Sequence, residues 1–206
     1  MAQEVTESLF GTPVYISDGY ELSSENKDAL IKEVKKNQRP NQNGNMISLN
    51  HYVLDIPYLS DFKKHIMKQV NKYVHEVLCI TKNVEVYITQ SWVNINHTDT
   101  SHHMHHHGNS FISGVYYLQG NTPITFDSKR DIFQNFFFEF TEKNYFNSAY
   151  CDVLVKEGRC ILFPSILSHS VNPNKNKEER ISLSFNTFIR GNLITTPENM
   201  SELTLK

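Results

Sequence analysis

The sequence predicts a mainly β protein with flanking helices, whose core is a double-stranded β-helix of the jelly-roll or cupin-like kind. Three observations support this: two helical segments come first, at least seven short strand segments follow, and the chain has no internal repeat. Many short strands separated by turn residues are typical of closed or sandwiched sheets. We expect one domain over residues 1–206, with helical support in 1–82, the β-helix core in 83–190 and a C-terminal tail in 191–206.

Two amphipathic helices are predicted in the N-terminal part. Ser23–Lys36 begins with polar residues that favour a helix start and carries an apolar stripe. Leu59–Cys79 repeats apolar residues at intervals of three and four, which predicts a helix packed on the outside of a sheet. A short strand is predicted at Phe10–Ile16, and Gln38–Gly44, rich in Asn, Gln and Pro, is predicted as a loop.

The period of the apolar residues changes to two at the start of the long strand Val84–Asn96. Its even-numbered residues share one face, which is apolar at the beginning and polar at the end. That gradient is expected of a barrel interior that is packed at one end and carries chemistry at the other. The further strands that we expect are Ser113–Leu118, Pro123–Phe126, Val153–Val155, Cys160–Phe163 and Arg180–Ile189, with a hairpin turn at Gly120-Asn121 and a turn at Gly158.

Two late segments differ in regularity. The aromatic-rich segment 131–150 has no clear period. We interpret it as an edge strand and a loop that cover the barrel, with a substrate-gripping lid as the alternative. The last strand alternates cleanly, so that a polar face made of Arg180, Ser182, Ser184 and Asn186 lies opposite an apolar face.

Charge, cysteine content and hydropathy exclude several classes of protein. A formal net charge of −2 offers no basic surface for phosphates, which disfavours nucleic acid as a partner. The three cysteines fit neither a zinc ribbon nor a disulfide framework, so we expect reduced thiols and a cytoplasmic location. The N-terminal residues lack a signal-peptide pattern and no apolar run is long enough to span a bilayer, so no membrane partner is expected.

Five of the ten histidines lie between Ser101 and His107. On a strand, His105 and His107 project from one face about 7 Å apart, and two such imidazoles can share a metal. A third ligand must come from elsewhere, and His169 is the only histidine downstream. A loop that binds metal adventitiously is the alternative for the cluster taken alone.

His169 is followed eleven residues later by Arg180-Ile181-Ser182, and at this point the chain resembles the 2-oxoglutarate- and Fe(II)-dependent oxygenases. More narrowly, it is similar to a branch common in marine bacteria and their phages. The resemblance covers Phe10 to Ile189 and is carried by the ordered motifs W-V-N, H-x-H-x-N-S, S-G-V-Y-Y, E-G-x-x-x-L-F-P-S, H-S-V-x-P-N and E-R-I-S-L-S-F-N.

The resemblance implies that His105, His107 and His169 hold Fe(II) on one face and leave positions open for co-substrate and O₂. The family's usual set is H-x-D or H-x-E with a distal histidine, so His107 is a departure that adds one positive charge and could favour another metal, zinc included. A conventional H-x-D stands at His97-Thr98-Asp99 and ranks second. His103, paired with His105, is a third alternative.

The resemblance also implies the co-substrate site and the reaction. Arg180 would anchor the far carboxylate of 2-oxoglutarate through paired hydrogen bonds, with a hydroxyl from Ser182. Asn94 and, more weakly, Tyr117 are further candidates for this pocket. The expected activity is hydroxylation of a small molecule or of an amino-acid or peptide side chain, with 2-oxoglutarate converted to succinate.

Two other functions remain open at this level. A cupin-type dioxygenase with three histidines would bind its substrate directly to the metal and would not use 2-oxoglutarate. A non-catalytic β-barrel would close its metal site with a fourth ligand, for which His103 and His106 are available. The sequence predicts neither the substrate nor the oligomeric state.

Overall fold

The computed structural model describes residues 11–127, 136, 138–194 and 203–206. Its helices are α1 (Ser24–Lys36) and α2 (Ser60–Lys72), with 3-10 turns η1 (Val53–Asp55) and η2 (Pro57–Leu59) before α2 and a π-helical turn η3 (Tyr73–Val77) after it. Its strands are β1 (Tyr15–Ser17), β2 (Gln38–Pro40), β3 (Met46–Ser48), β4 (Val84–Asn96), β5 (His102–His105), β6 (Ile112–Gln119), β7 (Ile124–Asp127), β8 (Tyr150–Val153), β9 (Cys160–Pro164), β10 (His169–Val171), β11 (Arg180–Asn192) and β12 (Thr204–Leu205).

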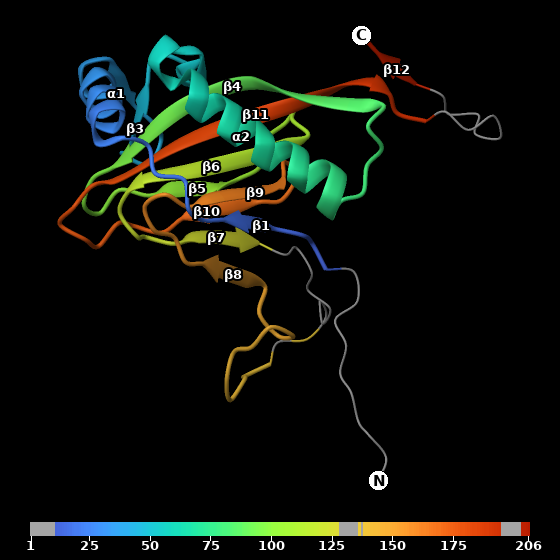
Figure 1. Cartoon of the computed structure of the whole chain (residues 1–206). Coiled ribbons are helices and arrows are strands. Elements are labelled where there is room, and N and C mark those ends of the chain that lie inside the picture. The colour runs from blue at the N-terminus through green and yellow to red at the C-terminus, as the bar shows by residue number, and fades with distance from the viewer. Residues whose placement is uncertain (1–10, 128–135, 137, 195–202) are drawn as a thin grey trace.

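The described strands form two antiparallel sheets. The large sheet has the order β1-β9-β6-β11-β4-β3-β2, with β12 paired to β11, and the small sheet has the order β5-β10-β7-β8. Strands distant in sequence are neighbours in both sheets, as in β11 between β4 and β6. Figure 1 shows the small sheet on one side of the large sheet and the helices on the other. This is the predicted double-stranded β-helix, a jelly roll with N-terminal helices packed outside it.

Both predicted helices are confirmed. Ser23 caps α1, because its hydroxyl accepts a hydrogen bond from the backbone N–H of Asn26 at 3.3 Å. The apolar stripes of the two helices pack with inward residues of β4 and β11 in one core, which includes Leu30, Phe62, Ile66, Val70, Val93, Ile95, Ile181 and Leu183. A second, smaller core lies between the sheets around β6, β7 and β9. No helix among the described residues combines the length and apolarity needed to cross a bilayer.

The prediction that even-numbered residues of Val84–Asn96 share one face is wrong. Asn186 of β11 pairs with Gln90 and Thr187 with Ile88, so Thr89 is an extra residue on β4. Such a bulge reverses the inward and outward positions that follow it. Val86 therefore shares the helix-facing core with Val93 and Ile95, whereas Trp92 and Asn94 face the opposite side.

Three other local predictions need correction. Gln38–Gly44 is not all loop, because β2 pairs with β3 as a short edge strand. Gly120-Asn121 is not a hairpin turn, because β6 belongs to the large sheet and β7 to the small one. The strand predicted at Val153–Val155 is β8, which ends at Val153 and forms an edge of the small sheet. Residues 131–135 and 137 of the aromatic segment 131–150, and Phe10 of the first predicted strand, lie outside the described residues, and the described part of the segment has no strand before β8 begins at Tyr150.

Candidate metal centre and anion pocket

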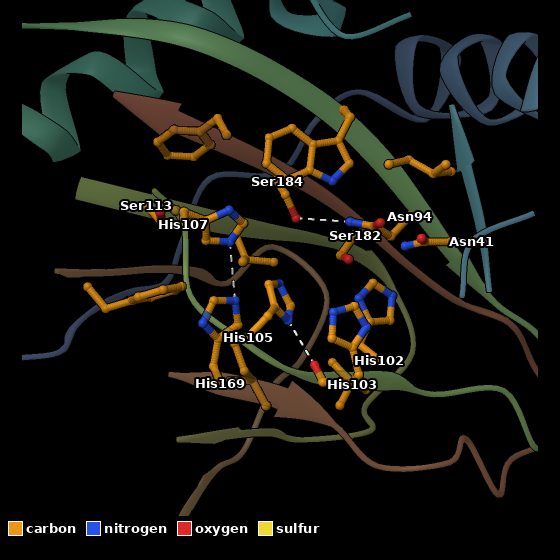
Figure 2. A pocket seen from close by; sticks show the side chains of 18 of the residues that line it. Asn41, Asn94, His102, His103, His105, His107, Ser113, His169, Ser182 and Ser184 are labelled. Atoms are coloured by element: carbon orange, nitrogen blue, oxygen red, sulfur yellow. Dashed lines mark hydrogen bonds between the residues drawn. The ribbon is translucent and has the colours of Figure 1, made fainter. Parts of the chain in front are cut away.

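A cavity of about 190 Å³ lies between the two sheets. The large sheet contributes polar side chains from β4 and β11, and the small sheet contributes histidines from β5 and β10. Apolar residues of β6, β7, β9 and β10 form the remaining wall. Figure 2 shows His102, His103, His105 and His169 on one side of the cavity, Asn94, Ser182 and Ser184 on the other, and His107 beside Ser113.

Three histidines converge at one end of this cavity. The ligand nitrogens that His105, His107 and His169 can offer all lie within 4.8 Å of one another. His107 Nε2 is 3.3 Å from His169 Nε2, and the ring centroid of His105 is 5.1 Å from that of His107 and 4.4 Å from that of His169. No Asp, Glu or Cys joins this group in the described part of the chain. The donor set has the chemistry of a metal site with open positions.

Two different backbone elements bring these imidazoles together. His105 is the last residue of β5 and lies directly opposite His169 of β10 in the antiparallel ladder. His107 lies beyond the end of β5, so the prediction that both residues of the H-x-H pair project from one strand is wrong. Its position is fixed instead by its backbone N–H, which donates to the carbonyl oxygen of Ser165 at 3.0 Å.

Hydrogen bonds orient two of the three rings toward the centre of the group. Nδ1 of His105 donates to the carbonyl oxygen of His103 at 2.8 Å, and Nδ1 of His169 donates to that of Leu167 at 3.0 Å. A carbonyl oxygen can only accept, so both histidines carry their proton on Nδ1. Their Nε2 atoms therefore present lone pairs to the centre, which is the tautomer that a metal requires.

Burial keeps these imidazoles neutral. Burial is the main cause that lowers the pKa of His169 to about 3 and that of His107 to about 4, and neighbouring histidines add to both shifts. Burial also lowers the pKa of His105, partly opposed by its hydrogen bond to the backbone. Near pH 7 all three imidazoles are therefore neutral. A metal does not have to compete with the extra proton of an imidazolium ion.

Arg180 lies on β11 and is 2 % exposed. Its Nε donates to the carbonyl oxygen of Thr122 at 3.1 Å, and its Nη1 donates to Ser182 Oγ at 3.2 Å. Cζ lies 5.0 Å from the ring centroid of Tyr117, a cation–π distance. No carboxylate of the described residues forms an ion pair with this guanidinium. A buried charge without a counter-ion costs several kcal/mol in a folded protein, and an anion bound beside the guanidinium would offset that cost.

Buried polar atoms without partners accompany Arg180. Asn96, the cross-strand neighbour of Arg180, has neither its amide nitrogen nor its amide oxygen paired among the described residues. His102 Nε2 and the Tyr117 hydroxyl are likewise buried and unpaired. Buried polar groups are normally satisfied, and clustered exceptions indicate that a polar ligand or water completes them. His102 was not singled out from the sequence, where it is one of five clustered histidines.

The other predicted candidates lie as follows. Asn94 lines the cavity and its Nδ2 donates to Ser184 Oγ at 3.1 Å. Tyr117 is fully buried beside Arg180, and burial raises its pKa to about 12. The alternative ligands His97 and Asp99 do not line the cavity: both are exposed, His97 lies 3.2 Å from a Glu179 oxygen, and Asp99 pairs with Lys175. The exposed His103 lines the cavity and His106 does not, and neither joins the three-histidine group.

The fold and this site agree with the comparison to known proteins. The model of the family described as "Putative 2OG-Fe(II) oxygenase" matches residues 90–186, which contain the three histidines and Arg180. No curated protein matches the chain. The matched stretch is thus similar to the 2-oxoglutarate- and Fe(II)-dependent oxygenases, and it covers most of the β-helix core.

Solved structures with the same fold are only distantly similar in sequence. A 2OG-Fe(II) oxygenase family oxidoreductase from Burkholderia pseudomallei is 11% identical with a TM-score of 0.58, over 84% of each chain. A non-heme alpha-ketoglutarate-dependent carbocyclase from nogalamycin biosynthesis is 11% identical with a TM-score of 0.61, over 85% of this chain and 79% of its own. A Pseudomonas putida prolyl-4-hydroxylase is 16% identical with a TM-score of 0.55, over 85% and 92%. At these identities the likeness establishes the fold.

Proposed function

We propose that the protein is a 2-oxoglutarate-dependent oxygenase whose Fe(II) is held by His105, His107 and His169 and whose co-substrate is anchored by Arg180. The observation that carries this proposal is the combination of both features in one cavity. Three neutral imidazoles converge at one end, and a buried guanidinium without a carboxylate partner stands among the polar residues of the same lining. A metal and a dicarboxylate satisfy the two ends together.

The residues present fit both groups. Three Nε2 donors of neutral imidazole suit Fe(II), although the third neutral ligand in place of a carboxylate leaves the centre one charge more positive. A planar guanidinium suits a carboxylate, and Ser182 already lies 3.2 Å from it. Asn94 and Tyr117 belong to the same proposed co-substrate pocket. Asn94 forms part of its polar wall, and the ring of Tyr117 supports the guanidinium of Arg180 by a cation–π contact. When bound, Fe(II) and 2-oxoglutarate supply the oxidation chemistry, in which O₂ is consumed and 2-oxoglutarate becomes succinate and CO₂.

The chain itself supplies orientation and a shielded chamber. The backbone carbonyls of His103 and Leu167 hold the His105 and His169 rings in the ligating tautomer. Ile124 and Val171 of the small sheet and Phe163 of the large sheet give the cavity an apolar wall, which limits water beside the metal. Arg180 and Ser182 fix the far end of the co-substrate and thereby set the position of its other end.

Hydroxylation of a small molecule, or of an amino-acid or peptide side chain, is the reaction that we propose within this class. One solved structure with this fold is titled a prolyl-4-hydroxylase and another a carbocyclase, so the fold accommodates more than one outcome. The formal net charge of −2 disfavours nucleic acid as the substrate, because nucleic-acid affinity depends largely on neutralising phosphates.

The test measures succinate formed by the purified protein with Fe(II), 2-oxoglutarate and O₂. Uncoupled turnover is expected with wild-type protein and is expected to disappear in His169→Ala and in Arg180→Ala. Calorimetry of the metal-loaded protein with 2-oxoglutarate separates the alternatives. A three-histidine dioxygenase that binds its substrate directly would show no specific 2-oxoglutarate binding, and a closed structural site would show none and would resist chelators. Either result contradicts the proposal.

A further inference from the structure

Asn174 is a fully buried side chain at the centre of the loops that surround Arg180. It belongs to the H-S-V-x-P-N motif, lies between β10 and β11, and has an exposed fraction of 0 %. The proposed function gives it no role, because it is not among the residues that line the cavity. A buried amide needs partners for both its nitrogen and its oxygen, so the partners of Asn174 indicate what it holds in place.

Both ends of this amide have partners. Its Nδ2 donates to the backbone carbonyl oxygens of Asn96 at 3.1 Å and Glu178 at 2.8 Å. Its Oδ1 accepts from Thr122 Oγ1 at 2.9 Å and from the backbone N–H of Asn176 at 3.2 Å. Carbonyl oxygens only accept and a backbone N–H only donates, so these partners fix the orientation of the amide. One side chain therefore ties together three segments: the end of β4, the connection between β6 and β7, and the loop before β11.

Each of these three segments adjoins Arg180. Thr122 supplies the backbone carbonyl oxygen that accepts from Arg180 Nε at 3.1 Å. Asn96 is the cross-strand neighbour of Arg180 in the ladder of β4 and β11, and Glu178 precedes Arg180 by two residues. The hydroxyl that donates to Asn174 and the carbonyl that accepts from Arg180 belong to the same residue, Thr122. Asn174 therefore restrains the carbonyl oxygen to which the guanidinium is bonded.

The direction of the guanidinium depends on this arrangement. The bonds from Nε to Thr122 and from Nη1 to Ser182 Oγ fix the plane of the group, and the other N–H groups of Arg180 lie in the same plane. A carboxylate meets a guanidinium through two parallel hydrogen bonds in one plane, so a turn of that plane weakens both bonds. The position of Thr122 thus sets how well Arg180 can bind a carboxylate.

We propose that Asn174 is a positioning residue, which acts through Thr122 to aim Arg180 at the far carboxylate of the co-substrate. Loss of its side chain turns the guanidinium and lowers the affinity for a dicarboxylate, whereas the three histidines keep their places. This inference rests on the proposed function. It adds to that function a residue that does not line the cavity and yet determines how strongly the far carboxylate is bound.

The experiment compares two ligands that differ only at the far end. 2-Oxopentanoate has the same 2-oxo acid group as 2-oxoglutarate but a methyl group in place of the far carboxylate. Their affinities for the Co²⁺-loaded protein without O₂ are measured by calorimetry or by the change in the Co²⁺ absorption spectrum. The wild type is expected to prefer 2-oxoglutarate, because only this ligand has a carboxylate for Arg180. Asn174→Ala is expected to weaken 2-oxoglutarate binding roughly 10-fold, the effect of one impaired charge-assisted hydrogen bond, and to leave the affinities for 2-oxopentanoate and Co²⁺ unchanged.

A second set of variants leaves the buried asparagine in place. Thr122→Val removes the hydroxyl but keeps the backbone carbonyl and the shape of the side chain, so it should reproduce the selective loss of 2-oxoglutarate affinity. Thr122→Ser keeps a hydroxyl and should recover most of the affinity that Thr122→Val loses. Thr98→Val is the matched control, because it removes another threonine hydroxyl bond of these loops, from Thr98 Oγ1 to the carbonyl oxygen of Asn176 at 2.9 Å, and keeps Thr122. Both ligands are expected to bind it as they bind the wild type.

The outcomes separate this inference from the proposed function. If the wild type binds the two ligands equally, or if Arg180→Met keeps the preference for 2-oxoglutarate, the proposed co-substrate anchor itself is wrong. If Arg180→Met loses the preference but Asn174→Ala and Thr122→Val retain it in full, the anchor stands and the positioning role of Asn174 is wrong. Equal losses of affinity for both ligands and Co²⁺ would also contradict the role, because Asn174 would then support the fold as a whole. Should Asn174→Ala fail to fold, Thr122→Val decides between these outcomes.

Discussion

The two ends of the cavity meet the cost of burial in opposite ways. At the histidine end the groups are neutral, and two of the three rings have their Nδ1 satisfied by backbone carbonyls. At the arginine end the group is charged, has two hydrogen bonds and is surrounded by unpaired polar atoms of Asn96, His102 and Tyr117. The polar groups of the histidine end have partners before a ligand binds. The charge and the unpaired polar atoms of the arginine end would gain their partners from a ligand. Metal binding and co-substrate binding should therefore affect the stability of the fold differently.

Removal of one histidine is the change with the largest expected effect on the histidine end. His169→Ala leaves two ligands on one side of the metal, and we expect the affinity for Fe(II) or Co²⁺ to fall by two or more orders of magnitude. Turnover of 2-oxoglutarate should fall to background. Metal titration by calorimetry and succinate assays check this, and Co²⁺ affinity within threefold of the wild type would contradict it.

Replacement of the guanidinium tests the opposite end. Arg180→Met keeps the length and removes a buried unpaired charge, so the unliganded protein is expected to become more stable by about 1–4 kcal/mol while 2-oxoglutarate binding is lost. Added 2-oxoglutarate should raise the unfolding temperature of the metal-loaded wild type and leave that of the variant unchanged. Thermal unfolding with and without 2-oxoglutarate measures both effects. Arg180→Lys is the control, since it keeps the charge but not the paired donors. A destabilised Arg180→Met protein would contradict the expected difference between the two ends of the cavity.

Acid should affect the histidine end next, because the guanidinium of Arg180 keeps its charge over the pH range in which His169 titrates. His169 has a folded pKa of about 3, below the value near 6.5 of an unfolded histidine, so the unfolded state binds more protons between these limits. Its contribution is complete above pH 6.5 and is lost as the pH falls, at about 1.4 kcal/mol per pH unit. Urea unfolding at pH 7 and pH 5 in a chelator measures this loss. His169→Gln should show a shallower pH dependence, and an unchanged dependence would be contrary to expectation.

The smallest effects are expected at the H-x-D that lies outside the cavity. Asp99 pairs with Lys175 between two exposed side chains, and such surface pairs contribute between zero and about 1 kcal/mol. His97→Ala and Asp99→Asn should leave Co²⁺ affinity and succinate formation within twofold of the wild type. A tenfold loss of metal affinity in either variant would move the metal ligands to this motif.

The parts of the fold that the sequence predicted are those with a sustained period. The apolar residues of α2 recur every three or four residues, and β11 alternates from Arg180 to Phe185 without interruption, so both the helix and the polar cavity wall followed from the pattern. The face of β4 did not, because the extra residue Thr89 is followed by the polar Gln90 and Ser91, which give no apolar signal for the change of face. β2 was missed because Gln38-Arg39-Pro40 has no strand propensity and is held only by pairing with β3.

The residues of the candidate site likewise fall into those that the sequence predicted and those that it did not. Spacing and the distal His169 identified the three histidines that converge and the arginine that shares their cavity. The contacts of Asn186 with His107 and of Ser165 with Ser113 did not follow from spacing, because they depend on strands and loops that meet only in three dimensions. The expected common strand of His105 and His107 failed for a local reason, since β5 ends before His107 and the backbone of Ser165 takes over.

Gly120 lies in the segment that connects β6 of the large sheet to β7 of the small sheet, and its replacement would affect Arg180. It has a φ of +86°, and a methyl group added there would come within 2.9 Å of the Arg180 Cα and 3.2 Å of its Cβ. Any replacement would thus press against the backbone of Arg180, the proposed co-substrate anchor, while every residue that lines the cavity stayed the same. A screen for variants with weakened 2-oxoglutarate binding is therefore expected to include substitutions of Gly120, a residue that does not line the cavity.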